Sequence, residues 1–197
     1  MTTSTLAQIE AWQAKLLCRR YFTVRFDSAS IRATGAAGFR DFRVVWALGS
    51  LSDGTCELLG SWPFSISQSN SWIRVADDLG ARGLERITHV FASEGLSGMT
   101  GWSDVLTRFD PVLALPSRHR RALRRVDDTA QRLRRRVERS VARQGLFSDS
   151  HDAAAFVART LMRAENGLED GGSLTPPPRS RVSASRVTDI CSVVMGS

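Results

Sequence analysis

The chain has 197 residues, a formal net charge of +7 and a pI near 10.7, and 42% of its residues are hydrophobic. No apolar run reaches the roughly 18 residues of a membrane span, and residues 1–10 lack the pattern of a signal peptide, so neither is predicted. Three distant cysteines predict neither a disulfide framework nor a zinc site, and we expect a cytoplasmic protein of one domain with a tail.

The first third of the chain predicts one helix followed by three strands. Helical spacing of apolar residues covers 5–19, within an N-terminal segment 1–20. From Tyr21 the apolar period becomes two and continues to Ile31, which predicts a strand. Residues 40–50 and 55–62 predict two further strands. The Asp-Gly dipeptide between them favours a hairpin, so three antiparallel strands in a row are expected.

The middle of the chain changes to alternating helices and strands. Residues 67–82 have the apolar spacing of a helix, residues 86–92 form a short apolar strand, and residues 101–109 predict a second short helix. Three antiparallel strands that lead into βα units indicate an α/β fold with a mixed sheet flanked by helices.

Two helices and a tail complete the predicted chain. Residues 117–143 form the longest helical pattern, and residues 149–165 form the last one. Glycine, serine, proline and arginine dominate residues 167–197, which predicts a disordered tail. The folded core is therefore expected over residues 21–166.

The positive charge is concentrated in the long predicted helix. Residues 1–116 hold 11 basic and 11 acidic residues, whereas residues 117–145 hold 11 arginines against three acidic residues. Such a stripe is typical of a surface that binds phosphates, although a solvated outer face would have the same composition. The candidate contacts to double-stranded DNA are Arg118, Arg120, Arg121, Arg124, Arg125, Arg132, Arg134, Arg135, Arg136 and Arg139.

Two carboxylates occupy positions suited to metal chemistry. Asp27 lies on the first predicted strand and Glu94 in the loop after the fourth, and we place both at the ends of neighbouring strands. Carboxylates that converge from several elements hold the paired Mg²⁺ or Mn²⁺ ions of phosphoryl-transfer enzymes. Solvated residues at strand ends would give the same pattern.

An ordered series of motifs resembles the catalytic domain of the mutator family of bacterial transposases. Its members are WQAKLLCRRYFTVRFDSASIR at 12–32, VVWALGSLSDGTCELLGSW at 44–62, the helix with Arg82-Gly83, and SEGLSGM at 93–99. Residues 115–161 resemble the family's C-terminal helices. The resemblance implies an RNase H-like fold, and it implies that Asp27 and Glu94 stand at the first two catalytic positions.

The departures from the family pattern predict impaired catalysis. Glu94 replaces an aspartate, and Gln131 stands where the resemblance places the third carboxylate. Asp127 and Asp128, about one helical turn earlier, are the available substitutes, with Asp127 on the same side of the helix as Gln131. The helical insertion that separates the last two acidic positions in the family is absent between 94 and 131.

The leading hypothesis is a degenerate transposase core that binds the DNA backbone, associates with the nucleoid and does not cut DNA. A second hypothesis is an interaction protein that pairs with, and inhibits, a full-length transposase or forms a homo-oligomer. A third is an active nuclease with a rebuilt acidic site that requires Mg²⁺ or Mn²⁺.

Overall fold

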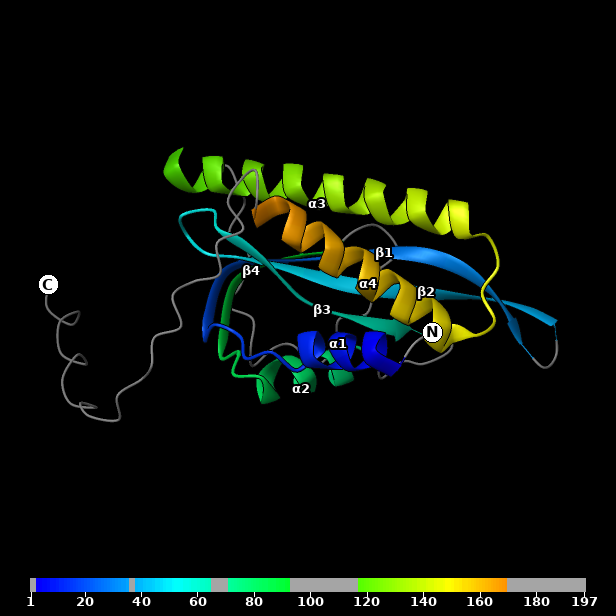
Figure 1. Ribbon diagram of the computed structural model, residues 1–197. Helices are drawn as coiled ribbons and strands as arrows, with labels where there is room; N and C mark the ends of the chain where they lie inside the picture. The colour runs from blue at the N-terminus through cyan, green and yellow to red at the C-terminus, as the bar shows by residue number, and fades with distance from the viewer. Residues whose placement is uncertain (1–2, 36–37, 65–70, 93–116, 170–197) are drawn as a thin grey trace, which may run out of the picture.

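The computed structural model describes residues 3–35, 38–64, 71–92 and 117–169, which form an α/β fold (Figure 1). The elements in chain order are α1 (Thr3–Gln13), β1 (Arg20–Gly35), β2 (Gly38–Ser50), β3 (Cys56–Phe64), α2 (Ser71–Ala81), β4 (Arg86–Ala92), α3 (Ser117–Gln144) and α4 (Ser150–Glu169). None of the described helices is long and apolar enough to cross a bilayer.

The four strands form one mixed sheet in the order β3-β2-β1-β4. β2 is antiparallel to both β1 and β3, and β4 is parallel to β1, so the predicted run of three antiparallel strands within a mixed sheet is confirmed. The turn between β2 and β3 follows the predicted chemistry. The Thr55 amide donates to Asp53 Oδ1 at 2.8 Å, and Gly54 adopts a φ of 89° that favours glycine.

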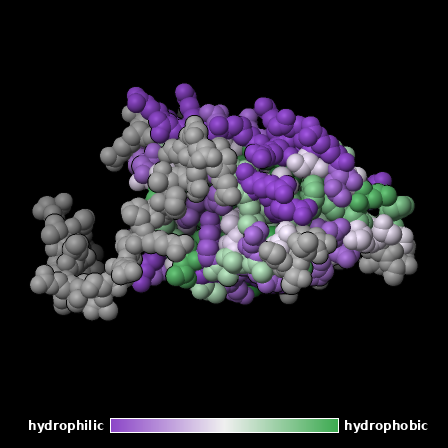
Figure 2. Space-filling model, in the orientation of Figure 1, coloured by the Kyte–Doolittle hydropathy of each residue, from purple (hydrophilic) through white to green (hydrophobic). Residues whose placement is uncertain are grey.

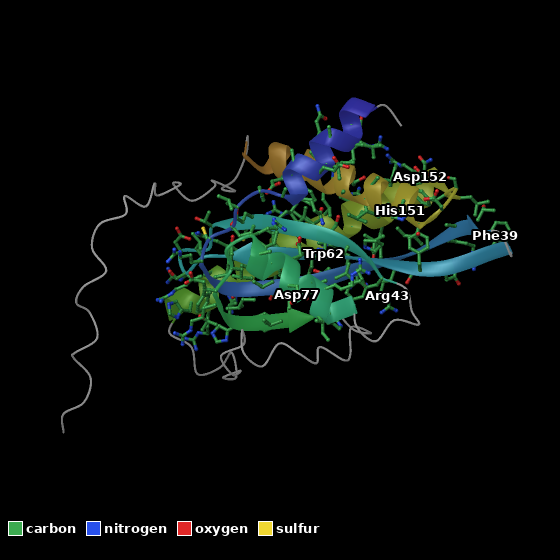
Figure 3. The ribbon with its side chains drawn as sticks, turned by 90° about the horizontal axis from the view of Figure 1, so that it is seen from below. Phe39, Arg43, Trp62, Asp77, His151 and Asp152 are labelled. Atoms are coloured by element: carbon green, nitrogen blue, oxygen red, sulfur yellow. The ribbon has the colours of Figure 1, made fainter. Side chains whose placement is uncertain are left out.

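β1 and β2 continue beyond their neighbours as a long hairpin. The pairs run from Thr23↔Ser50 to Gly35↔Gly38, whereas β4 stops opposite Phe26. The segment before α4 contacts the edge of β1 that β4 does not reach, because the amide of Thr34 donates to the Phe147 carbonyl at 2.9 Å. Figure 3 shows its tip at Phe39, far from α2.

Helices cover both faces of the sheet. α3 and α4 pack on one face, where Trp46, Leu58, Leu133 and Leu161 are among the buried residues of what we call the α3–α4 core. α2 packs on the opposite face (Figure 1). Successive residues of β2 pack alternately against the helices on the two faces of the sheet. The middle of β2 is therefore an unbroken run of apolar residues, as expected for a strand that is buried on both sides.

Four of the five predicted helices are confirmed, although their first and last residues differ from the prediction. α1 stops at Gln13, six residues before the predicted end at 19, and Leu16 beyond it is 83% exposed. The amide of Leu17 instead donates to the Arg82 carbonyl at 2.9 Å, which draws the chain to the end of α2. α4 continues to Glu169, three residues into the predicted tail. The short helix predicted over 101–109 and the tail from 170 onward lie outside the described residues.

Glu165 of α4 joins three elements at the open edge of β3. Its Oε1 accepts from the amide of Leu58 at 3.1 Å and from Lys15 Nζ at 3.1 Å. Its Oε2 accepts from Trp12 Nε1 at 2.7 Å. A single carboxylate thus satisfies a backbone donor of the edge strand and fastens α1 to α4.

Glu57 is the second carboxylate of this cluster. Lys15 Nζ lies 3.9 Å from Glu57 Oε2, and the Tyr21 hydroxyl donates to Glu57 Oε1. Burial raises the pKa of Glu57, the charge of Lys15 lowers it, and the charge of Glu165 raises it. One lysine therefore faces two carboxylates in a largely buried setting.

Replacing Glu57 by Gln should raise the free energy of unfolding at pH 7 by about 1 kcal/mol, because the raised pKa means that the folded state disfavours the charged carboxylate, and Lys15 keeps Glu165 as its partner. A carboxyl with a raised pKa in the folded state stabilises that state below its unfolded pKa, and the contribution is lost as pH rises. The advantage of Glu57→Gln should therefore shrink toward pH 4, because wild-type Glu57 then holds its own proton. Urea denaturation at both pH values measures this. Glu85→Gln is the control, because its pair with Arg19 (3.4 Å) is exposed. A less stable Glu57→Gln at pH 7 would contradict the expectation.

Candidate functional site

Asp27 lies inside β1, next to the point where β4 ends. The parallel pairing of β1 with β4 stops at Phe26↔Ala92, so Asp27 is the first β1 residue past the carboxyl end of β4. The expectation that Asp27 ends its own strand is wrong, because β1 runs on for eight residues to Gly35. Continued pairing with β2 and cover from α3 and α4 extend it.

The side chain of Asp27 is buried and faces α3. The residue is 1% exposed, and Ala29 and Ile31 on the same side of β1 belong to the α3–α4 core. Its Oδ1 is buried and has no hydrogen-bond partner among the described residues. A carboxylate in such a place requires a compensating cation or a proton.

Arg25 supplies the compensating charge. Its Nε donates to Asp27 Oδ2 at 3.2 Å, and its Nη1 donates to Asp127 Oδ1 of α3. The two residues of β1 share a face because successive side chains of a strand alternate. The guanidinium therefore lies between two carboxylates and connects the sheet to α3.

Opposing effects act on the ionisation of Asp27. Burial is the largest, and it raises the pKa of Asp27 above its ordinary value. The charge and the hydrogen bond of Arg25 and the charge of Arg134 lower this pKa, and the charge of Asp127 raises it. The net direction is upward, so burial outweighs the two arginines.

The structure brings only one of the proposed substitute carboxylates to this place. Asp127 contacts Arg25, whereas Asp128 is exposed and its carbonyl accepts from Arg132 Nε at 3.4 Å. Gln131 is also exposed. Helical spacing puts it between Asp127 and Arg134 on one side of α3. Glu94 lies outside the described residues.

The described residues do not fit a divalent metal ion as they stand. They include no group of three His, Cys, Asp or Glu side chains close enough to hold one. Asp27 Oδ1 is the right kind of ligand, but the guanidinium of Arg25 binds the other oxygen and also binds Asp127. Gln131 adds a neutral amide, which is a poor ligand for Mg²⁺.

A groove of about 440 Å³ runs beside β1 next to this site. Residues 28–30 of β1 and the side chains of Arg43, Arg134 and Glu138 are among those that line it. Figure 3 shows Arg43 on the sheet between α2 and the hairpin tip. Serine and arginine are residue types whose side chains donate hydrogen bonds to phosphate oxygens.

The arginines of α3 cover its outer side. Leu123, Val126, Leu133 and Val137 form the buried stripe. Figure 2 shows a hydrophilic band along α3. The described side chains of the predicted set are all exposed, namely Arg120, Arg121, Arg124, Arg125, Arg132, Arg134, Arg135, Arg136 and Arg139; the side chain of Arg118 lies outside the description.

Some of these arginines already have partners within the helix. Arg134 Nε donates to Glu138 Oε1 at 2.8 Å, and Arg132 and Arg139 bond to groups one turn away. Arg121, Arg124, Arg125 and Arg136 make no hydrogen bond or ion pair with another described residue. They are therefore available to an external anion.

Arg25 is the site residue that sequence analysis missed. The sequence predicts a role for Asp27, whereas Arg25 lies in a region of balanced charge that indicates no site. The signal that identifies it is the period of the strand, since residues i and i+2 share a face. Its second partner, Asp127, is 102 positions along the chain, which no local pattern reveals.

Comparison with known proteins gives consistent matches. A family model described as "Transposase, Mutator family" matches residues 1–109, a stretch that contains Asp27 and Glu94 and ends before α3. The chain is 30% identical over 111 residues to a probable transposase for insertion sequence element ISRM3-like from Sinorhizobium fredii. It is 28% identical over 111 residues to the transposase for insertion sequence element ISRM3 from Rhizobium meliloti. Each match covers 56% of this chain and 27% of the relative, so the matched part is about a quarter of those proteins.

Proposed function

Because the chain belongs to the mutator family of transposases, we propose that it binds the backbone of double-stranded DNA and does not cleave it. The family connects the chain with DNA transposition. Binding to the bacterial nucleoid is part of this proposal.

The observation that carries the proposal is the position of the arginines. The excess of positive charge lies in residues 117–145, and these arginines lie opposite the buried stripe of a helix of 28 residues. A rigid helix with guanidinium groups on its solvent-exposed side can present them to the phosphates along a DNA strand. Contacts of this kind fix position on the duplex and carry no sequence information.

An RNase H-like arrangement is part of the same proposal. The sheet order is β3-β2-β1-β4 and β4 is parallel to β1, so Asp27 lies beside the carboxyl end of β4 on the face that α3 covers. The resemblance implies an RNase H-like fold with Asp27 at the first catalytic position, and the mixed sheet is consistent with that fold. The position of Asp27 supports a common origin for this acidic site and the acidic sites of active family members.

The loss of cleavage is supported by the state of the acidic site. Asp27 is paired with Arg25, and Gln131 supplies no charge on the adjacent side of α3. An active nuclease is the second candidate function. Arg25 brings Asp127 close to Asp27, and the two carboxylates would form a rebuilt acidic site if Arg25 moved away. Pairing with a full-length transposase stays a prediction.

Binding to a random DNA duplex across a salt series tests DNA binding. Each phosphate contact contributes about 0.9 to the slope of log K against log salt concentration. The variant Arg121→Gln/Arg125→Gln/Arg136→Gln removes three unpaired arginines. It should lower the magnitude of the slope by about 2–3 and weaken binding at least about tenfold near 0.1 M salt. Fluorescence anisotropy with a labelled duplex measures both quantities.

The matched control removes the same charge from other surfaces. Arg20→Gln/Arg74→Gln/Arg163→Gln changes three exposed arginines on β1, α2 and α4. It should keep the wild-type slope. Equal losses in the two variants would mean that only net charge matters. Absence of binding by the wild type at low salt would contradict the proposed function.

A further inference from the structure

We infer that Asp27 and Asp127 form a divalent-cation site that the guanidinium of Arg25 fills, so that the chain binds Mn²⁺ only when Arg25 is removed. The inference rests on the proposed loss of cleavage and is independent of DNA binding by α3.

The first support is the placement of the charges. Arg25 Nε lies 3.2 Å from Asp27 Oδ2, and Arg25 Nη1 contacts Asp127 Oδ1. One cation thus stands between carboxylates from two different elements, β1 and α3. A divalent ion that links two carboxylates requires the same arrangement, with oxygen ligands from converging elements.

The second support is an unused ligand atom. Asp27 Oδ1 is buried and has no hydrogen-bond partner among the described residues, while Oδ2 of the same group is bound to Arg25. The Asp27 side chain is 2% exposed, so water does not compensate this oxygen freely. This oxygen is therefore a possible ligand atom that no described residue uses.

The third support is the freedom of the second carboxylate. The Asp127 side chain is 56% exposed, so it can turn toward a smaller ion when the guanidinium is gone. A metal ion also keeps water ligands, which fill the positions that protein oxygens do not reach. Arg134 is the remaining positive neighbour of Asp27, and its Nε is bonded to Glu138.

Titration with Mn²⁺ in the absence of DNA tests the inference. The wild type, Arg25→Gln and Arg25→Gln/Asp27→Asn are compared by calorimetry and by the electron paramagnetic resonance signal of free Mn²⁺. We expect Arg25→Gln to bind one Mn²⁺ at least about tenfold more tightly than the wild type, and the double variant to lose this binding. Mn²⁺ should also raise the melting temperature of Arg25→Gln and leave that of the wild type unchanged.

Arg32→Gln is the matched control. Arg32 Nε lies 3.1 Å from Asp41 Oδ1 on the same hairpin, but both side chains are exposed, at 63% and 59%. Removing this arginine frees a single solvated carboxylate, and Mn²⁺ binding should equal that of the wild type.

Two results would overturn the inference. One is Mn²⁺ binding by Arg25→Gln that is no tighter than that of the wild type. The other is tight binding by the wild type that Asp27→Asn abolishes, because Arg25 would then not fill the site. If Arg25→Gln is unfolded in a chelator, Mn²⁺ should restore its circular dichroism spectrum, and failure of millimolar Mn²⁺ to do so contradicts the inference equally.

Discussion

Replacing Arg25 by Met should lower the free energy of unfolding by about 3–5 kcal/mol at neutral pH in a chelating buffer. Arg25 pairs with Asp27, which is 1% exposed, and also with Asp127 on α3. Its loss leaves a buried carboxylate without its nearest cation and removes a connection between the sheet and the helix. Urea denaturation followed by circular dichroism measures the change.

A second substitution separates the cost of the buried charge from a loss of packing. Arg25→Met/Asp27→Leu removes both charges and keeps similar side-chain volumes. Its stability should return to within about 1 kcal/mol of the wild type, because apolar replacements of a buried ion pair are often neutral or stabilising. The control Arg32→Met breaks an exposed pair and should cost at most about 1 kcal/mol. A double variant as unstable as Arg25→Met would show that the buried charge is not the cause.

Replacing Gly49 by Ala should destabilise the protein by about 1–3 kcal/mol through overpacking. A Cβ atom at this position would lie 2.8 Å from Leu59 Cδ2 and 2.8 Å from two ring carbons of Tyr21. The ring cannot turn away easily, since the Tyr21 hydroxyl donates to Glu57 and accepts from the Cys18 amide at 3.1 Å. Thermal denaturation monitored by circular dichroism measures the loss.

Gly80→Ala provides a comparison of opposite sign. Gly80 lies in α2, and a Cβ atom there would meet nothing within 4 Å. Alanine is the better helix former by up to about 1 kcal/mol, so this variant should be as stable as the wild type or more stable. Equal effects of the two substitutions would mean that space around Gly49 is not limiting.

Local patterns in the sequence predict most of the fold. The strand over 86–92 is confirmed at both ends, and the helix over 117–143 is confirmed with one additional residue. The Asp-Gly turn between β2 and β3 is equally local. Each of these elements depends on the spacing of neighbouring residues, which a sequence displays directly.

The parts that were not predicted depend on distant contacts. The extension of β1 beyond Ile31 requires β2 on one side and Phe147 on the other. α1 ends early because Leu17 bonds to Arg82. At the candidate site, the position of Asp27 on its strand and the resemblance both predict its role, whereas only the structure shows the contact of Arg25 with Asp127. Pairing over 102 positions depends on the path of the whole chain.

The contact of α1 with Glu165 affects the order in which the chain folds during synthesis. Trp12 and Lys15 leave the ribosome about 150 residues before their partner Glu165. The four strands of the described residues are complete at Ala92, whereas α3 and α4, which cover one face of the sheet, are not. At about 5–20 residues per second, the 73 residues from Ala92 to Glu165 take about 4–15 s to synthesise. During that time the face of the sheet around Trp46 and Leu58 lacks the cover of α3 and α4, and exposed apolar surface of this kind makes a partly folded chain prone to aggregation.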